Sequence, residues 1–80
     1  MLSVSTPSNN LVVHSEQIDV GGSVDPDSSL SINNQVVPIS EKGTFNVKVP
    51  LEPGLNVLTI VATNKFKRQS TMIRNIRLEK

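Results

Sequence analysis

The sequence predicts an all-β protein built as a β-sandwich of about seven short antiparallel strands, and three observations support this prediction. The chain has 80 residues, which is enough for one small domain with a single thin core. Val and Ile together number 17, whereas Ala occurs once; β-branched residues favour strands, and Ala favours helices. Apolar and polar residues alternate over short segments, with turn residues between them roughly every 8–12 positions.

The first half of the chain contains the earlier of these strands. Alternation with a period of two predicts strands over residues 11–14, 17–24 and 35–39, and another around Leu30 and Ile32. Asp25-Pro26-Asp27-Ser28 has the composition of a turn, because Pro fixes φ and Asp side chains accept backbone hydrogen bonds. Asn33-Asn34 predicts a tight hairpin turn, since Asn tolerates positive φ. Pro38 cannot donate to a ladder, so its strand is expected at a sheet edge.

The second half alternates over longer segments. Glu41-Lys42-Gly43 predicts a turn, residues 44–49 a strand, and Pro50 the end of that strand. Glu52-Pro53-Gly54 predicts the next turn, with Gly54 at the position of positive φ. Residues 56–63 form the longest expected strand, in which Val57 and Val61 face away from an inward set of three: Leu58, Ile60 and Ala62. A polar loop over residues 64–69 leads to the last expected strand, residues 71–78.

The last segment admits a second interpretation. Phe66, Met72, Ile73 and Ile76 also lie near helical spacing among basic residues, which would be a basic amphipathic helix. We favour the strand, because a sheet without it would expose an unpaired edge. A strand puts Ile73 and Ile76 on opposite faces, and we expect a β-bulge to reconcile them.

The N-terminal residues have the composition of a linker. Residues 3–10 are rich in Ser, Thr, Asn and Pro. We therefore expect residues 1–10 to be a linker or flexible arm, and residues 11–80 to form the sandwich. This composition also leads us to expect a module taken from a longer chain.

The order of motifs over Leu11 to Leu78 resembles that of bacterial immunoglobulin-like domains, most closely in pattern the domain-B family of glucodextranase. The residues that carry the resemblance are Gly22-Ser23-Val24-Asp25-Pro26-Asp27, Leu30-x-Ile32-Asn33, Gly43-Thr44-Phe45-x-Val47-x-Val49, Leu51-x-Pro53-Gly54-x-Asn56 and Leu58-x-Ile60-x-Ala62-x-Asn64. Two positions depart from the family pattern: Asn34 stands where Gly is usual, and Lys65-Phe66-Lys67-Arg68 replaces a usual Gly-Asn pair. The second departure makes the last loop basic and bulky.

The resemblance implies an immunoglobulin-like sandwich without catalytic residues or cofactors. It implies a spacer or adhesive module of a secreted or surface-displayed bacterial protein. We expect a structural spacer or protein-interaction domain, whose partners are neighbouring domains of the same chain and, in the interaction role, another protein. The alternative is an accessory module that binds carbohydrate or a cell-wall polymer next to a catalytic domain. Independently of the resemblance, Asn56 follows a glycine turn, where its amide is placed to satisfy backbone groups of the crossover.

Composition excludes several kinds of chemistry. The chain has no Cys, Trp or Tyr and a single His, which excludes thiolate sites, multi-His metal sites and the usual rings for stacking on sugars or bases. The net charge of +1 does not suit a nucleic-acid-binding arm, and no apolar run approaches the roughly 18 residues of a membrane span. His14 and Ser15 are neighbours on a strand and point to opposite faces, so with Asp19 they do not predict a nucleophile triad. We expect no enzyme activity.

Charge is distributed unevenly along the chain. Residues 1–41 carry five acids and no Lys or Arg, whereas residues 42–80 carry eight basic residues and two acids. Interleaved strands would mix these charges in space; alternatively, the Asp25–Asp27 turn of one module contacts the basic loop of the next. Asp25 and Asp27 are also weak candidates for Ca²⁺ ligands, although Asp-Pro-Asp is ordinary turn chemistry. The candidate interaction patch consists of Lys65, Phe66, Lys67 and Arg68.

Overall fold

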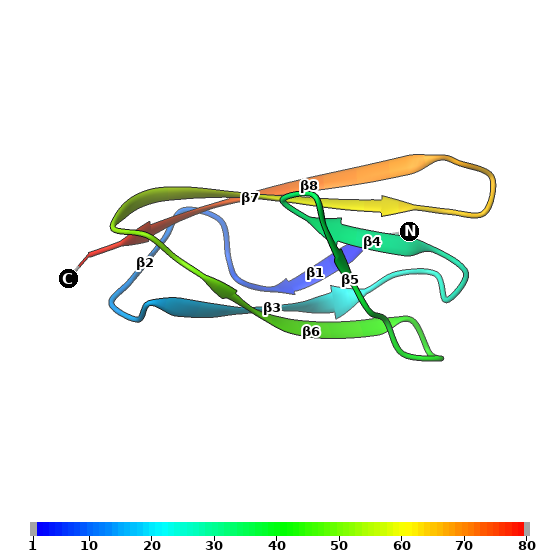
Figure 1. The fold of residues 1–80 in the computed structure, drawn as a ribbon, viewed down its shortest axis with the longest axis horizontal. Helices are drawn as coiled ribbons and strands as arrows, with labels where there is room; N and C mark the ends of the chain where they lie inside the picture. Colours follow the sequence, from blue (N-terminus) through cyan, green and yellow to red (C-terminus); the bar gives the residue numbers. More distant parts are fainter. Residues whose placement is uncertain (1, 80) are drawn as a thin grey trace.

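The computed structural model describes residues 2–79, which form eight strands in two sheets (Figure 1). The strands are β1 (Ser3–Thr6), β2 (Leu11–Val13), β3 (Gln17–Ser23), β4 (Ser29–Ile32), β5 (Gln35–Val37), β6 (Thr44–Pro50), β7 (Gly54–Thr63) and β8 (Gln69–Leu78). Within residues 2–79 no helix is long and apolar enough to cross a membrane.

The two sheets form the layers of a sandwich, as the sequence predicts. The three-stranded sheet has the order β1-β3-β6, and the five-stranded sheet has the order β2-β8-β7-β4-β5. Figure 1 shows the β7–β8 hairpin above the β3–β6 pair. The expectation of antiparallel strands holds for every described pair except β2 and β8, which are parallel. The chain changes sheet between β1 and β2, and β2 therefore reaches β8 from another layer and not through a hairpin.

The core lies between the layers and comes from both sheets. Leu58, Ile60 and Ala62 of β7 are buried, which confirms the inward face predicted from their alternation. Val57 on the opposite face is half exposed. The buried hydrophobic residues are Leu2, Val20, Val24, Leu30, Ile32, Val37, Phe45, Leu51, Leu58, Ile60, Ala62, Ile76 and Leu78.

The structure differs from the expected linker at the start of the chain. Residues 3–6 form β1, which pairs antiparallel with β3 at Ser3↔Ser23 and Val4↔Gly22. β1 comes so close that a Cβ at Gly22 would overlap the backbone of Ser3. The composition of this segment does not indicate a strand, because a short edge strand with mostly exposed side chains needs few apolar residues.

The last segment is a continuous strand, so the helical interpretation is wrong. β8 pairs with β7 without a register shift from Gly54↔Leu78 to Thr63↔Gln69, and the expected β-bulge is therefore absent from this described pair. Ile76 is fully buried while Ile73 is 50% exposed. The opposite faces need no reconciliation, because Ile73 lies on the outer face of the five-stranded sheet.

The predicted turns have the expected backbone conformations. Asn33 and Asn34 have φ values of 50° and 69°, which confirms the tight hairpin between β4 and β5. Gly54 has a φ of 97°, as its place in the turn requires. β5 lies at the edge of its sheet, as predicted, although it ends at Val37, before Pro38.

The chain runs through the sandwich from one end to the other. The longest dimension of the molecule is 41 Å, and Figure 1 shows the start of β1 and the end of β8 toward opposite ends of it. The pairings agree with this view: Ser3 pairs with Ser23, beside the β3–β4 turn, whereas Leu78 pairs with Gly54, beside the β6–β7 link.

Candidate functional site

Two loops of opposite charge meet at one end of the sandwich, which we call the charged end. It consists of the Asp25–Ser28 turn between β3 and β4 and the loop over residues 64–68 between β7 and β8. Asn64 shapes the second loop, because its Oδ1 accepts the N–H groups of Phe66 at 2.9 Å and Arg68 at 3.0 Å. Lys67 takes a φ of 64° there. The loop therefore has a defined shape that presents its side chains outward.

The predicted patch residues lie at this end. Lys65 Nζ lies 3.9 Å from Asp27 Oδ2 and 5.4 Å from the centre of the Phe66 ring. The Phe66 side chain is 73% exposed. A shallow hollow of about 320 Å³ runs between the two loops, lined by Asp25, Pro26, Asp27, Ser28, Asn64, Lys65 and Phe66. This end therefore combines cations with an exposed aromatic ring.

The two loops lie at the same end of the molecule, which bears on whether the opposite charges of the two halves mix within one module or meet between successive modules. Asp27 and Lys65 come from the acidic and basic halves of the sequence and face each other within one molecule. Interleaved strands therefore mix the charges. A stack in which the Asp25–Asp27 turn of one module contacts residues 65–68 of the next would need these loops at opposite ends, and the structure contradicts it.

The candidate Ca²⁺ ligands lie in a setting that suits an ion pair better. Ca²⁺ in proteins is held by about six to eight oxygen ligands. Residues 2–79 contain no group of three or more His, Cys, Asp or Glu side chains placed to hold a metal ion, and the Lys65 ammonium lies beside Asp27. Asp27 thus faces a cation of its own chain, and Ca²⁺ binding at Asp25 and Asp27 stays a prediction.

His14 and Ser15 lie near the opposite end of the molecule and bond to different backbone groups. His14 Nδ1 donates to the Glu79 carbonyl oxygen at 2.7 Å. Ser15 Oγ accepts a long hydrogen bond of 3.4 Å from the Gln17 N–H. These bonds stabilise the chain around β2 and the start of β3, and His14 and Ser15 lie between these two strands and not on one strand as expected.

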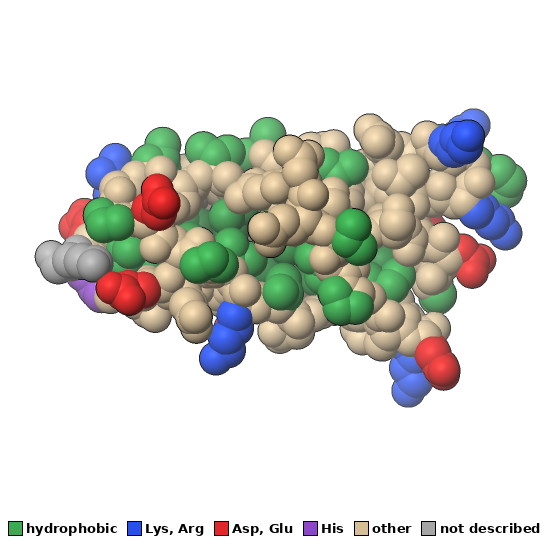
Figure 2. Space-filling model, in the orientation of Figure 1, with side chains coloured by type: hydrophobic (Ala, Val, Ile, Leu, Met, Phe, Trp, Pro, Cys, Tyr) green, Lys and Arg blue, Asp and Glu red, His purple; other side chains and the backbone are tan. Residues whose placement is uncertain are grey.

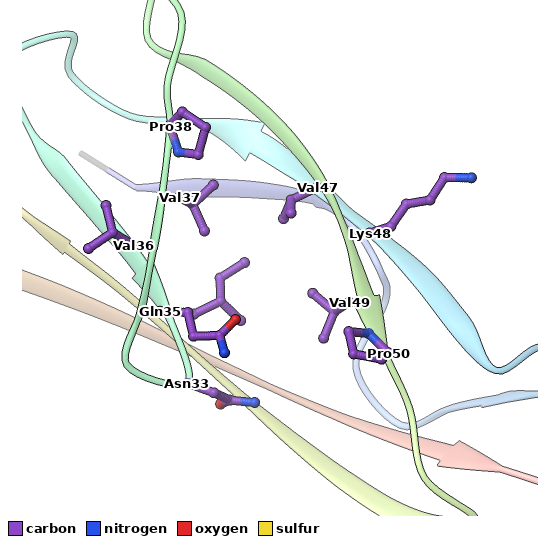
Figure 3. A pocket seen from close by; sticks show the side chains of 10 residues that line it. Asn33, Gln35, Val36, Val37, Pro38, Val47, Lys48, Val49 and Pro50 are labelled. Carbon is purple, nitrogen blue, oxygen red and sulfur yellow. The ribbon is translucent and has the colours of Figure 1, made fainter.

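A second surface lies along the open side of the sandwich, between β5 and β6, and we call it the edge groove. It encloses about 230 Å³ and is lined by Ile32, Asn33, Gln35, Val36, Val37, Pro38, Val47, Lys48, Val49 and Pro50. In Figure 3 Val37 and Val49 point into the space between the two strands, while Val36 and Lys48 point away from it. Figure 2 shows hydrophobic side chains along the middle of this face and charged ones mostly toward the two ends. The groove is thus mainly apolar.

The edge groove arises because two edge strands of unequal length face each other. β5 has three residues and is the edge of one sheet, while β6 has seven residues and is the edge of the other. Pro38 signalled the first edge in the sequence. The edge position of β6 could not be predicted from the sequence, because its alternation is the same whether or not another strand lies beside it.

Comparison with known proteins agrees with this architecture. The sequence matches the family model described as glucodextranase, domain B, over residues 1–80. The fold is similar to that in solved structures of Clostridium thermocellum CbhA fibronectin(III)-like modules, with a TM-score of 0.70 and 11% identity over 99% of this chain and 96% of that one. No curated protein matches the sequence. The structural likeness confirms the predicted immunoglobulin-like sandwich, and the family match confirms the resemblance drawn from the motifs.

Proposed function

The chain belongs to the glucodextranase domain B family, and we propose that it works as a structural spacer or protein-interaction domain within a larger bacterial protein. In this proposal the larger protein is secreted or attached to the cell surface, and the neighbouring domains of the same polypeptide are the module's partners. The family takes its name from an enzyme, but its description designates one domain, and the fold resembles fibronectin(III)-like modules. A non-catalytic accessory role agrees with both.

The course of the chain is the observation that carries the spacer role. A module that separates two neighbours must receive the chain at one end and release it at the other. β1 begins and β8 ends toward opposite ends of a body 41 Å long (Figure 1). The β7–β8 ladder spans ten residues of each strand and runs along the long axis of the module (Figure 1). The module therefore separates its neighbours by close to its own length.

A replacement experiment in the parent protein tests the spacer role. The module is exchanged for an unrelated sandwich domain of similar length whose ends also lie apart, and the activity or binding of the neighbouring domains is measured. A spacer predicts that the exchange preserves their function and that deletion of the module impairs it. Loss of function with the replacement would overturn the spacer role and favour the interaction role. Fractionation of the producing cells tests location, and a cytoplasmic parent would contradict that part of the proposal.

The charged end supports the second candidate, an accessory module that binds a carbohydrate or an anionic cell-wall polymer. The exposed Phe66 ring offers a stacking surface, and the Lys65 ammonium lies beside it. Titration with soluble teichoic acid measures such binding. The variant Lys67→Ala/Arg68→Ala should weaken it, and Lys42→Ala, which removes a cation from a different loop, serves as the control. Equal affinity of the two variants, or no binding by the native chain, would reject this candidate.

A further inference from the structure

The edge strand β6 turns a set of backbone hydrogen-bonding groups outward. The Val24 N–H donates to the Gly43 carbonyl, and the Leu51 N–H donates to the Glu16 carbonyl; both bonds continue the β3–β6 register. Because ladder bonds in an antiparallel pair alternate, the odd-numbered residues of β6 bond to β3. The N–H and C=O groups of Asn46 and Lys48 therefore point to the open edge.

The start of this edge is already covered. The Thr44 carbonyl accepts the Ser40 N–H at 2.8 Å, and the Thr44 N–H donates to Ser40 Oγ at 3.1 Å. Pro50 at the other end has no N–H to donate. The groups free to pair with another strand are thus limited to Asn46 and Lys48, together with the Pro50 carbonyl.

The inward side chains of the same strand border an incomplete part of the core. Val47 and Val49 are partly buried, and both line the edge groove. The short β5 opposite them ends at Val37, so β5 covers only part of β6. An added strand beside β6 would pair the outward backbone groups and would also cover these valines.

We propose that the occupant of this edge is a second copy of the same chain, whose β6 pairs antiparallel with the first about a twofold axis at Val47. In this register Asn46 of each copy pairs with Lys48 of the other, so the outward N–H and C=O groups of both residues find partners. Val47 faces the Val47 of the second copy, and Phe45 faces Val49. The two three-stranded sheets become one continuous sheet, and each copy supplies valines that close the groove of the other.

Charge and backbone pairing select this register over its neighbours. If the twofold axis moves from Val47 to Lys48, the two Lys48 residues face each other and Asn46 pairs with Pro50. That register brings like charges together, and it loses a hydrogen bond because Pro50 has no N–H to donate. If the axis moves to Asn46 instead, Lys48 pairs with Thr44, whose N–H and carbonyl already bond to Ser40. Lysine on an edge strand usually discourages pairing, but here each lysine faces a neutral asparagine. Because the contact covers little more than one strand, we expect weak, concentration-dependent dimers.

Sedimentation equilibrium of the full chain from about 10 µM to about 1 mM tests the proposal, since weak dimers form in this range. Asn46→Lys puts a second ammonium opposite Lys48 and should weaken association about tenfold, whereas Asn46→Asp puts a carboxylate there and should strengthen it several-fold. Asn46 is exposed and its own neighbour on β3 is Gly21, so both changes spare the single molecule. Thr71→Lys, on an exposed position of the other sheet, is the charge-matched control and should leave association unchanged.

The double variant Asn46→Lys/Lys48→Gln removes the second ammonium across the interface and should recover association; a neutral residue at position 48 also avoids a carboxylate opposite Asp19 on β3. A chain that remains monomeric at about 1 mM, or dimers with equal affinity in the Asn46→Lys and Asn46→Asp variants, would overturn the proposal. So would a monomer whose β6 edge binds only a foreign extended peptide. None of these outcomes depends on the spacer role.

Discussion

An asparagine side chain holds the backbone at each end of the sandwich, but the two asparagines bond to different numbers of chain segments. At the crossover end, residues 51–53 carry the chain from β6 in one sheet to β7 in the other. At the charged end, the loop over residues 64–68 joins β7 and β8 within one sheet. The first link holds the layers together, whereas the second only closes a hairpin.

Asn56 bonds to the backbone on both sides of the crossover. Its Oδ1 accepts the Glu52 N–H at 3.0 Å, and its Nδ2 lies within bonding distance of the carbonyls of Glu52 at 2.8 Å, Gly54 at 3.2 Å and Ile76 at 3.3 Å. Leu51 beside it is buried, and its N–H donates to Glu16. This confirms the role predicted for Asn56 from its position after a glycine turn.

Asn64 bonds only within its own loop. Its Oδ1 accepts two N–H groups, from Phe66 and Arg68, and residues 65–68 are exposed. Water can replace such bonds at low cost. The module therefore keeps a fixed link between its layers and leaves the hairpin loop free to vary in sequence, which is where the basic residues of this chain depart from the family pattern.

The largest effect should come from Gly43, which lies in the loop before β6 and belongs to neither of the two compared links. Gly43 has a φ of 84°, and an added Cβ would overlap the Val24 carbonyl that faces it. Gly43→Ala should lower the free energy of unfolding by about 3 kcal/mol, through strain and the displaced strand end. Urea denaturation measures it. Gly54→Ala is the matched control: φ is 97° but nothing lies within 4 Å, so strain alone should cost about 1 kcal/mol. Equal losses would refute the steric argument.

Removal of the crossover amide comes next. Asn56→Ala leaves the Glu52 N–H and the part-buried Gly54 and Ile76 carbonyls without this partner. We expect a loss of about 2 kcal/mol in unfolding free energy, since unsatisfied buried groups are costly. Hydrogen exchange should show the loss at residues 51–56 and at Ile76. A loss below that of the Asn64 variant would reverse the ranking of the two ends.

The corresponding change at the charged end should be milder. Asn64→Ala removes bonds to N–H groups that solvent reaches, so we expect a loss of about 0.5–1 kcal/mol by the same denaturation measurement. Loop order should fall, which heteronuclear NMR relaxation at residues 65–68 detects. If those residues stay as rigid as in the native chain, Asn64 does not shape the loop.

The smallest effect should come from the ion pair. The Lys65 and Asp27 side chains are 63% and 75% exposed, and their charged atoms lie 3.9 Å apart. Lys65→Ala should change stability by less than about 0.5 kcal/mol, and added salt should erase even that. A salt-insensitive loss larger than the one measured for Asn64→Ala would show that the pair, and not Asn64, fixes this end.

Features that depend on near neighbours along the chain could be predicted from the sequence alone. Alternation placed Leu58, Ile60 and Ala62 inward, because successive side chains of a strand point to opposite faces. Turn chemistry located the positive φ values of Asn33, Asn34 and Gly54, and the glycine turn before Asn56 indicated its bonds to the crossover. These predictions held because each rests on a local rule.

Only the tertiary structure determines which segments far apart in the sequence pair or lie side by side. Residues 3–6 join the three-stranded sheet, β2 runs parallel to β8, and the acidic turn faces the basic loop at one end. The alternation in β6 is the same for a central strand and an edge strand, so its open side was invisible in the sequence. Strand pairing depends on contacts between residues far apart in the chain, and a local pattern specifies the face of a strand but not its neighbour.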